Sequence, residues 1–296
     1  MDPVERLYLD ALMEDPARPE GSVLTQLLAG ARARRRPAAS TASWAEPYAG
    51  RVAAMDALLA SAVDDDWNKL IVEGWTLQEL VAHLAAKDGL VAAAVGAPVL
   101  GPPLGALDAA GRTRDVQEHE RARSPEQTRR DWRAQADALC RHLTALDPSE
   151  LVAVDGVEAA LGDQVLARML ETWVHTGDAA STASLRLPDP VPEHIHPTAD
   201  LCARLLPWTM LFSGLDGSGR VLRLELTGAG GGTWHVPLGV ADAPSAGEDA
   251  SITADVVKFC FLLGGRGEPF SIGAELGGDV ELARDVLRTA QAMSGP

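Results

Sequence analysis

Apolar residues recur at helical spacing along one long stretch, residues 46–181, and this regularity limits the fold more than any other feature of the chain. Thr76, followed three residues later by Glu79, has the pattern of a capping box, which marks a helix start. The turns that follow carry an apolar face with the spacing i, i+3, i+4, i+7, formed by Leu77, Leu80, Val81 and Leu84. The predicted helices run over residues 47–63, from Thr76 onward, and over about 124–146 and 162–180. Long helices joined by connections of varied length predict a four-helix bundle.

The pattern changes after the proline-rich segment 187–190. The predicted elements there are a helix at 199–212, strands at 220–226 and 233–238, and helices at 251–263 and 279–293. The glycine-rich segment 228–232 joins the two strands and lacks the GxGxxG spacing of a dinucleotide-binding loop, so we expect a hairpin turn. This mixture predicts a small α+β domain after the bundle.

The chain therefore divides into three predicted parts, and its fold class is predicted to be mainly α. Residues 1–43 form an N-terminal helical extension and linker, with helices around 4–13 and 22–36. Residues 44–187 form the helical bundle, and residues 188–296 form the smaller α+β domain.

The charge of the chain excludes some classes of function. Among its 296 residues are 42 Asp and Glu against 26 Lys and Arg, which gives a formal net charge of −16. Binding to nucleic acid phosphates or to anionic lipid needs clustered positive charge, so neither partner is expected. No window approaches the roughly 18 apolar residues of a membrane span. The first residues lack the basic and apolar segments of a secretory signal, so we expect a cytoplasmic protein.

Several common catalytic motifs are missing from the sequence. It contains no GxSxG, no GxxxxGK[ST] and no HExxH. His194 and His196 directly precede Pro197, and we expect them in a surface loop. The cysteines form no CxxC pair and are predicted to be buried reduced thiols: Cys140, Cys202 and Cys260.

His83, Glu171 and His175 are the most informative polar residues. Glu171 and His175 are four residues apart on a predicted helix, so their side chains project from one face. Two imidazoles and a carboxylate are a familiar ligand set for Zn²⁺, Ni²⁺ or Fe²⁺. The apolar stripe of that helix lies on the opposite side and is formed by Leu166, Met169, Leu170 and Trp173. The residues alone therefore leave two interpretations open, a metal site or a solvated Glu–His pair with an unrelated histidine.

Two segments resemble the motifs of a known family. Residues 73–84, EGWTLQELVAHL, followed by Asp88, are similar to the "GWT…dLvaHL…D" motif of the mycothiol-dependent maleylpyruvate isomerase family. Residues 168–178, RMLETWVHTGD, resemble its second motif, "R..ETWVHg.D". That family belongs to the DinB-like group of metal-binding four-helix bundles. The resemblance covers about residues 47–181, the C-terminal domain fits the same architecture, and residues 1–43 have no counterpart in it.

The resemblance implies a divalent metal, usually zinc, held by His83, Glu171 and His175. It also implies mycothiol as a thiol cosubstrate, whose cysteinyl sulfur acts at or near the metal. A coordinating thiol is deprotonated by the cation, which supplies a nucleophile at neutral pH.

Four charged residues are further candidates: Arg266 and Arg168 as catalytic residues, Arg266 also for binding the thiol cosubstrate, and Asp178 and Asp88 as partners of the histidines. Arg266 resembles the arginine of the family's "L.GR" turn, and its guanidinium suits a carboxylate of thiol or substrate. Arg168, one turn before Glu171, would steady that carboxylate, meet an anionic substrate, or be a solvated helix arginine. Asp178 and Asp88 are candidates to accept the second N–H of the ligating histidines, or are ordinary surface carboxylates.

These expectations define one leading hypothesis and two alternatives. The leading hypothesis is a mycothiol-dependent isomerase or S-transferase that acts on an electrophilic small molecule. One alternative is a thiol-exchange enzyme of antibiotic biosynthesis. The other is a non-catalytic, zinc-stabilised binding module, for which a fourth protein ligand such as His142 or a cysteine would close the site.

Overall fold

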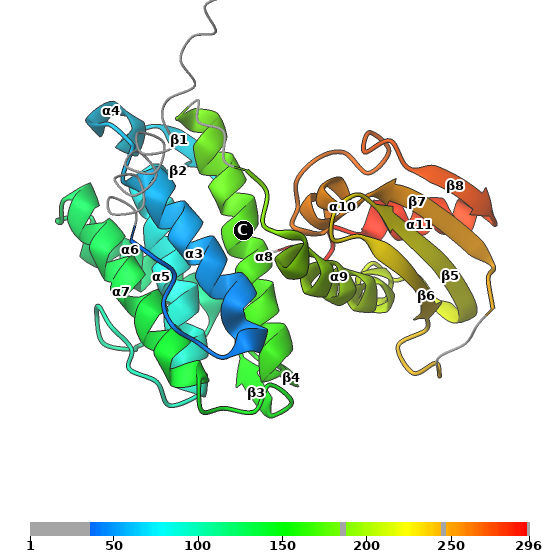
Figure 1. The fold of residues 1–296 in the computed structure, drawn as a ribbon, viewed down its shortest axis with the longest axis horizontal. Helices are drawn as coiled ribbons and strands as arrows, with labels where there is room; N and C mark the ends of the chain where they lie inside the picture. Colours follow the sequence, from blue (N-terminus) through cyan, green and yellow to red (C-terminus); the bar gives the residue numbers. More distant parts are fainter. Residues whose placement is uncertain (1–35, 184–187, 244–246, 295–296) are drawn as a thin grey trace, which may run out of the picture. The chain divides into compact units, whose positions relative to one another are not determined.

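The computed structural model describes residues 36–183, 188–243 and 247–294 (Figure 1). The predicted helices around 4–13 and 22–36 lie outside these residues, apart from Arg36. The boundaries predicted at 43/44 and 187/188 remain predictions. The elements of the first part are η1 (Ser43–Ala45), α3 (Glu46–Leu59), α4 (Asp64–Trp67), β1 (Leu70–Val72), β2 (Trp75–Thr76), α5 (Leu77–Ala94), α6 (Ala109–Glu120), α7 (Pro125–Leu143), β3 (Leu151–Val154), β4 (Val157–Ala160) and α8 (Leu161–Thr182).

The four long helices predicted from the sequence are α3, α5, α7 and α8, and they pack side by side as a bundle (Figure 1). The capping box that starts α5 is confirmed. The hydroxyl of Thr76 accepts a hydrogen bond from the backbone N–H of Glu79 at 3.2 Å, and the carboxylate of Glu79 accepts one from the N–H of Thr76 at 2.9 Å. Ser124 caps α7 in the same way, and Pro125 fills the first helical position.

Helix α6 was not predicted. Val116 is its one large aliphatic residue, so the segment lacks the periodic apolar signal on which the prediction rests. Its start is fixed locally, because the side chain of Asp108 accepts a hydrogen bond from the N–H of Gly111 at 2.7 Å. This helix lies against α5 and, as described below, supports the candidate site.

The C-terminal part is an α+β unit, as predicted. Its elements are α9 (Pro192–Phe212), β5 (Gly217–Thr227), β6 (Gly232–Leu238), β7 (Ala250–Asp255), α10 (Val256–Leu263), β8 (Glu275–Gly278) and α11 (Val280–Thr289). The strand order is β6-β5-β7-β8, in which β5 and β7 are parallel and the other pairs antiparallel. The hairpin between β5 and β6 turns through the glycine-rich segment, which confirms that prediction.

Three element predictions in this part were wrong. Residues 251–255 are strand rather than helix, and α10 begins only at Val256, capped by the carboxylate of Asp255. Strand β8 was not predicted. Helix α9 begins at Pro192, so His194 and His196 lie on a helix and not in a loop. Proline at a first helical position costs no hydrogen bond, and this allows the earlier start.

One apolar core runs through the bundle and the sheet unit. The rings of Trp173 on α8 and Phe261 on α10 meet edge to face, with centroids 5.2 Å apart. Phe261 also packs closely on Gly177, since a Cβ there would lie 3.0 Å from that ring and the ring would have to give slightly. All three cysteines are buried and unbridged, as predicted. Among the described residues, no helix is both long and apolar enough to cross a bilayer.

Candidate metal centre

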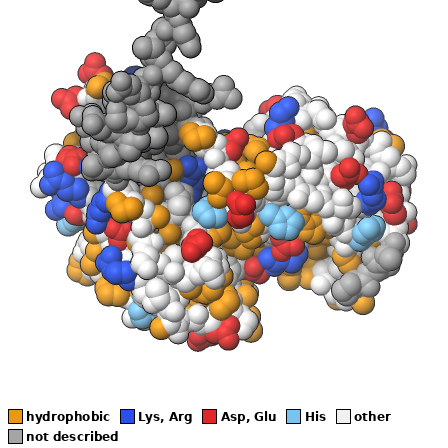
Figure 2. Space-filling model, in the orientation of Figure 1, with side chains coloured by type: hydrophobic (Ala, Val, Ile, Leu, Met, Phe, Trp, Pro, Cys, Tyr) orange, Lys and Arg blue, Asp and Glu red, His pale blue; other side chains and the backbone are white. Residues whose placement is uncertain are grey.

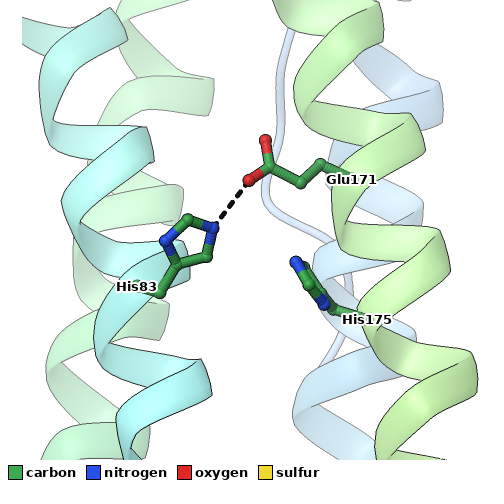
Figure 3. A group of neighbouring side chains, drawn as sticks. All are labelled: His83, Glu171 and His175. Atoms are coloured by element: carbon green, nitrogen blue, oxygen red, sulfur yellow. Dashed lines mark hydrogen bonds and ion pairs between the residues drawn. The ribbon is translucent and has the colours of Figure 1, made fainter. Parts of the chain in front are cut away.

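Helices α5 and α8 bring His83, Glu171 and His175 together (Figure 3). One potential ligand atom of each residue lies within 4.8 Å of the others. Nε2 of His83 is 2.8 Å from Oε1 of Glu171. The two imidazole rings meet edge-on, with centroids 5.6 Å apart. Within the described residues, no further His, Cys, Asp or Glu joins this group.

The polar face of α8 is buried because α5 covers it. His83 and His175 are 2% and 3% exposed, whereas the Glu171 side chain keeps 23% of its surface open. The centroids of the Trp75 and His83 rings are 4.9 Å apart, so the indole packs against the imidazole. The solvated Glu–His pair that the helical pattern left open is therefore not what the structure shows.

Each histidine is oriented through its Nδ1 atom. Nδ1 of His175 lies 3.0 Å from Oδ2 of Asp178, and a carboxylate only accepts, so this nitrogen donates its proton. The lone pair of a neutral His175 is then on Nε2. Nδ1 of His83 lies 3.0 Å from the hydroxyl of Thr113 on α6. The hydroxyl donates or accepts, and because Nε2 of His83 donates to Glu171, Nδ1 of a neutral His83 accepts from Thr113. Partners at Nδ1 orient the rings of metal-binding histidines.

Asp178 matches one of its two predicted roles, since it accepts the second N–H of His175. Asp88 matches neither of its predicted roles. Asp88 does not contact His83 and is not at the surface. It is fully buried and accepts hydrogen bonds from Nε of Arg168 at 2.9 Å and from the Trp132 indole N–H at 3.1 Å. The partner of His83 is Thr113, and sequence reasoning missed it because no motif links α6 to the site.

Arg168 connects Asp88 to Glu171. It is 3% exposed, and its Nη1 donates to Oε2 of Glu171. Burial alone would raise the pKa of Glu171, but the charge of Arg168 and the hydrogen bond to His83 hold it well below the ordinary value. Glu171 is therefore a carboxylate at neutral pH. Of the roles considered for Arg168, the geometry matches steadying Glu171 and not a solvated surface arginine.

Arg266 reaches the site from the turn after α10, and its expected pairing with a carboxylate of thiol or substrate stays a prediction. Its Nε donates to Oδ1 of Asp178 at 2.9 Å and its Nη2 to Oδ2 at 2.8 Å. The guanidinium thus binds a carboxylate of the chain itself. Burial would raise the pKa of Asp178, but His175 and Arg266 lower it. The sheet unit therefore helps to orient His175.

The residues considered as a fourth ligand are engaged elsewhere. Nε2 of His142 lies 2.9 Å from the backbone carbonyl of Val95. The cysteines are buried outside the group, and burial raises the pKa of Cys140 to about 12. A metal ion held by these three residues alone would keep a coordination position for another molecule, as in catalytic rather than structural zinc sites.

Comparisons with known proteins agree with this architecture. Residues 48–180 match the model of the mycothiol maleylpyruvate isomerase N-terminal domain. Uncharacterized proteins from two strains of Mycobacterium tuberculosis are each 28% identical over 246 residues, which is 82% of this chain and 91% of theirs.

Two solved structures have a similar fold. They are crystal structures of the mycothiol-dependent maleylpyruvate isomerase, one of them a histidine-to-alanine mutant. Each is 18% identical and covers 79% of this chain and 91% of its own, with TM-scores of 0.51 and 0.50. The shared fold therefore extends beyond the matched domain. Through residues 48–180, the chain is similar to the mycothiol maleylpyruvate isomerase N-terminal domain family.

Proposed function

We propose that this protein is a divalent-metal enzyme that uses the thiol of mycothiol to attack an electrophilic small molecule. The convergence of His83, Glu171 and His175 within 4.8 Å carries the proposal. Isomerisation and S-transfer are both open to such an enzyme. The match of residues 48–180 to the mycothiol maleylpyruvate isomerase N-terminal domain supports mycothiol as the thiol.

The donor set fits a zinc ion. Two imidazole nitrogens and one carboxylate oxygen match catalytic sites that keep a fourth position open. The Nδ1 partner of His175 leaves its Nε2 for the metal, and Glu171 is ionised without it. Nε2 of His83 donates to Glu171 in this structure, and the Thr113 hydroxyl can accept from Nδ1 when Nε2 binds the metal instead. A zinc ion bound there would lower the pKa of a coordinated thiol, so that the thiolate exists at neutral pH.

The residues around the ligands would hold the site in this geometry. Asp178 accepts the proton of His175 Nδ1, and Arg168 keeps Glu171 charged and fixed. The Trp75 ring shields one side of His83 from water. A thiolate that adds to an activated cis double bond forms a C–S bond and makes the carbon–carbon bond single. After rotation, loss of the same thiolate gives the trans isomer, whereas protonation of the adduct gives a conjugate.

Product masses test this proposal. Zinc-loaded protein is incubated with mycothiol and maleylpyruvate, or with other electrophiles, and the products are analysed by mass spectrometry. An isomer of unchanged mass indicates addition and elimination, and a product heavier by one thiol indicates S-transfer. Protein stripped of metal by a chelator should form neither product. Equal turnover by the stripped and loaded proteins would contradict the proposal.

Thr113→Val should weaken zinc binding while preserving side-chain shape. His83 would lose the partner of its Nδ1, and loss of such a partner costs roughly 10–100-fold in metal affinity. A competing chelating dye measures the dissociation constant. Thr289→Val is the matched control, because Thr289 is equally buried, at 5% exposure, and its hydroxyl bonds only within α11. Equal zinc affinity in the two variants would show that the Thr113 hydroxyl does not contribute to zinc binding.

A further inference from the structure

Lys87 is a cation at the candidate metal centre without a partner in the described part of the chain. It lies four residues after His83 on α5, so the two side chains share a helix face with Cβ atoms about 5–6 Å apart. It is half-buried and forms no hydrogen bond or ion pair with a described residue. Of the chain's other two lysines, Lys69 pairs with Asp66 at 2.7 Å and Lys258 is exposed in the first turn of α10.

The positive charge of Lys87 acts on Glu171, one of the proposed metal ligands. The charge of Lys87 is among the influences that lower the pKa of Glu171, after those of Arg168 and His83. Its flexible stem allows the ammonium to reach an incoming group beside the ligands.

The charge balance of the site calls for an anion. Before any metal binds, the net charge of this group is zero, because the two carboxylates of Glu171 and Asp88 balance the two cations Arg168 and Lys87. A divalent ion then leaves two positive charges, and a thiolate neutralises one of them. The remaining charge is in a half-buried region, where an unpaired charge is costly. A second anionic group is therefore expected next to the thiolate.

The other two cations near the site are already committed. Nε and Nη1 of Arg168 bind Asp88 and Glu171, and this side chain is buried. The guanidinium of Arg266 binds Asp178 through two nitrogens. Among the described residues near the site, Lys87 is thus the cation that is paired with no carboxylate of the chain.

We propose that Lys87 binds a carboxylate of the electrophilic substrate and makes the site selective for anionic over neutral electrophiles. This inference rests on the proposed function, since it assumes that the electrophile binds beside His83 and Glu171. It assigns to Lys87 the anion-binding role that the sequence suggested for Arg168 or Arg266.

Binding of maleate without any thiol tests the inference. Maleate has two carboxylates on a cis double bond, and its diamide has the same shape without charge. Calorimetric titration of zinc-loaded wild type, Lys87→Met, Lys87→Gln and Lys87→Arg gives the affinities. Loss of one charge-assisted hydrogen bond should weaken maleate binding by about 10–100-fold in the Met and Gln variants. Lys87→Arg should retain most of the affinity, and diamide binding should not change.

Lys258→Met removes one positive charge at an exposed position and should bind maleate like the wild type. Zinc content is measured in every sample. Wild type that binds no zinc would refute the proposed function. Zinc-loaded wild type that binds maleate no better than folded Lys87→Met or Lys87→Gln would overturn the role of Lys87 and leave the metal centre standing. Two neutral replacements are used so that misfolding of one leaves the other to decide.

Discussion

Arg168→Met is expected to destabilise the protein by about 3–5 kcal/mol, the cost of leaving a buried charge without its partner. Arg168 is the cation that pairs with Asp88, which is 0% exposed and would keep only uncharged partners, such as the Trp132 N–H and the Tyr48 hydroxyl. Glu171 would lose its charged neighbour as well. Urea unfolding at neutral pH measures the difference in free energy.

The loss should become smaller in acid. Burial already raises the pKa of Asp88 against the opposing charge of Arg168, and removal of that charge raises it further. When the pKa of a carboxyl is higher in the folded than in the unfolded state, the folded protein becomes more stable as the pH falls through the folded-state pKa. The deficit of Arg168→Met should therefore shrink toward acidic pH.

Arg204→Met is the matched control for this prediction. Arg204 also pairs with two carboxylates, Asp163 and Asp200, but its side chain is 46% exposed. Exposed pairs contribute about 0–1 kcal/mol, so its loss should be small. If Arg168→Met and the control unfold at the same urea concentration, the buried ion pairs of Arg168 with Asp88 and Glu171 do not stabilise the fold as predicted.

His175→Ala is expected to abolish stoichiometric zinc binding. The substitution removes a proposed ligand itself. Zinc affinity should therefore fall by more than the roughly 10–100-fold that follows from losing a hydrogen-bond partner of a ligand. Thiol-dependent turnover should disappear with the metal. Equilibrium dialysis against buffered zinc, followed by elemental analysis, measures the change.

His235→Ala is the control for this variant, because His235 is exposed on β6. It should bind one zinc per chain like the wild type. Circular dichroism checks that His175→Ala keeps its helices. A folded His175→Ala protein with the zinc affinity of the wild type would exclude His175 as a ligand.

The sequence predicted the parts of the fold that local rules determine. The capping box at Thr76 and the apolar stripe behind it were enough to place α5. Helix α6 was missed because Val116 alone gives no periodicity. Residues 251–255 alternate polar and apolar like a strand, but this run is short and leads directly into the apolar segment 256–263, so the whole stretch was predicted as one helix. Pairing of β7 with β5 decides the matter, and that pairing is a long-range contact.

The site was predictable to a different extent. The spacing of Glu171 and His175 places them on one face of a helix, but whether that face is buried depends on how α5 packs against α8. The resemblance named the three residues, and only the structure gives their geometry. The pairs His83–Thr113 and Asp178–Arg266 join residues 30 and 88 positions apart. No periodic pattern reports contacts of that kind.

The central claim is that three side chains hold one divalent ion that still has room for a thiolate. Cobalt substitution tests it most directly, because thiolate binding to Co²⁺ adds a sulfur-to-metal charge-transfer absorption. We predict one cobalt per chain, and a new near-ultraviolet band when mycothiol is added that is absent with an S-methylated thiol. A protein that takes up no stoichiometric cobalt, or whose cobalt spectrum does not respond to mycothiol, would contradict the account.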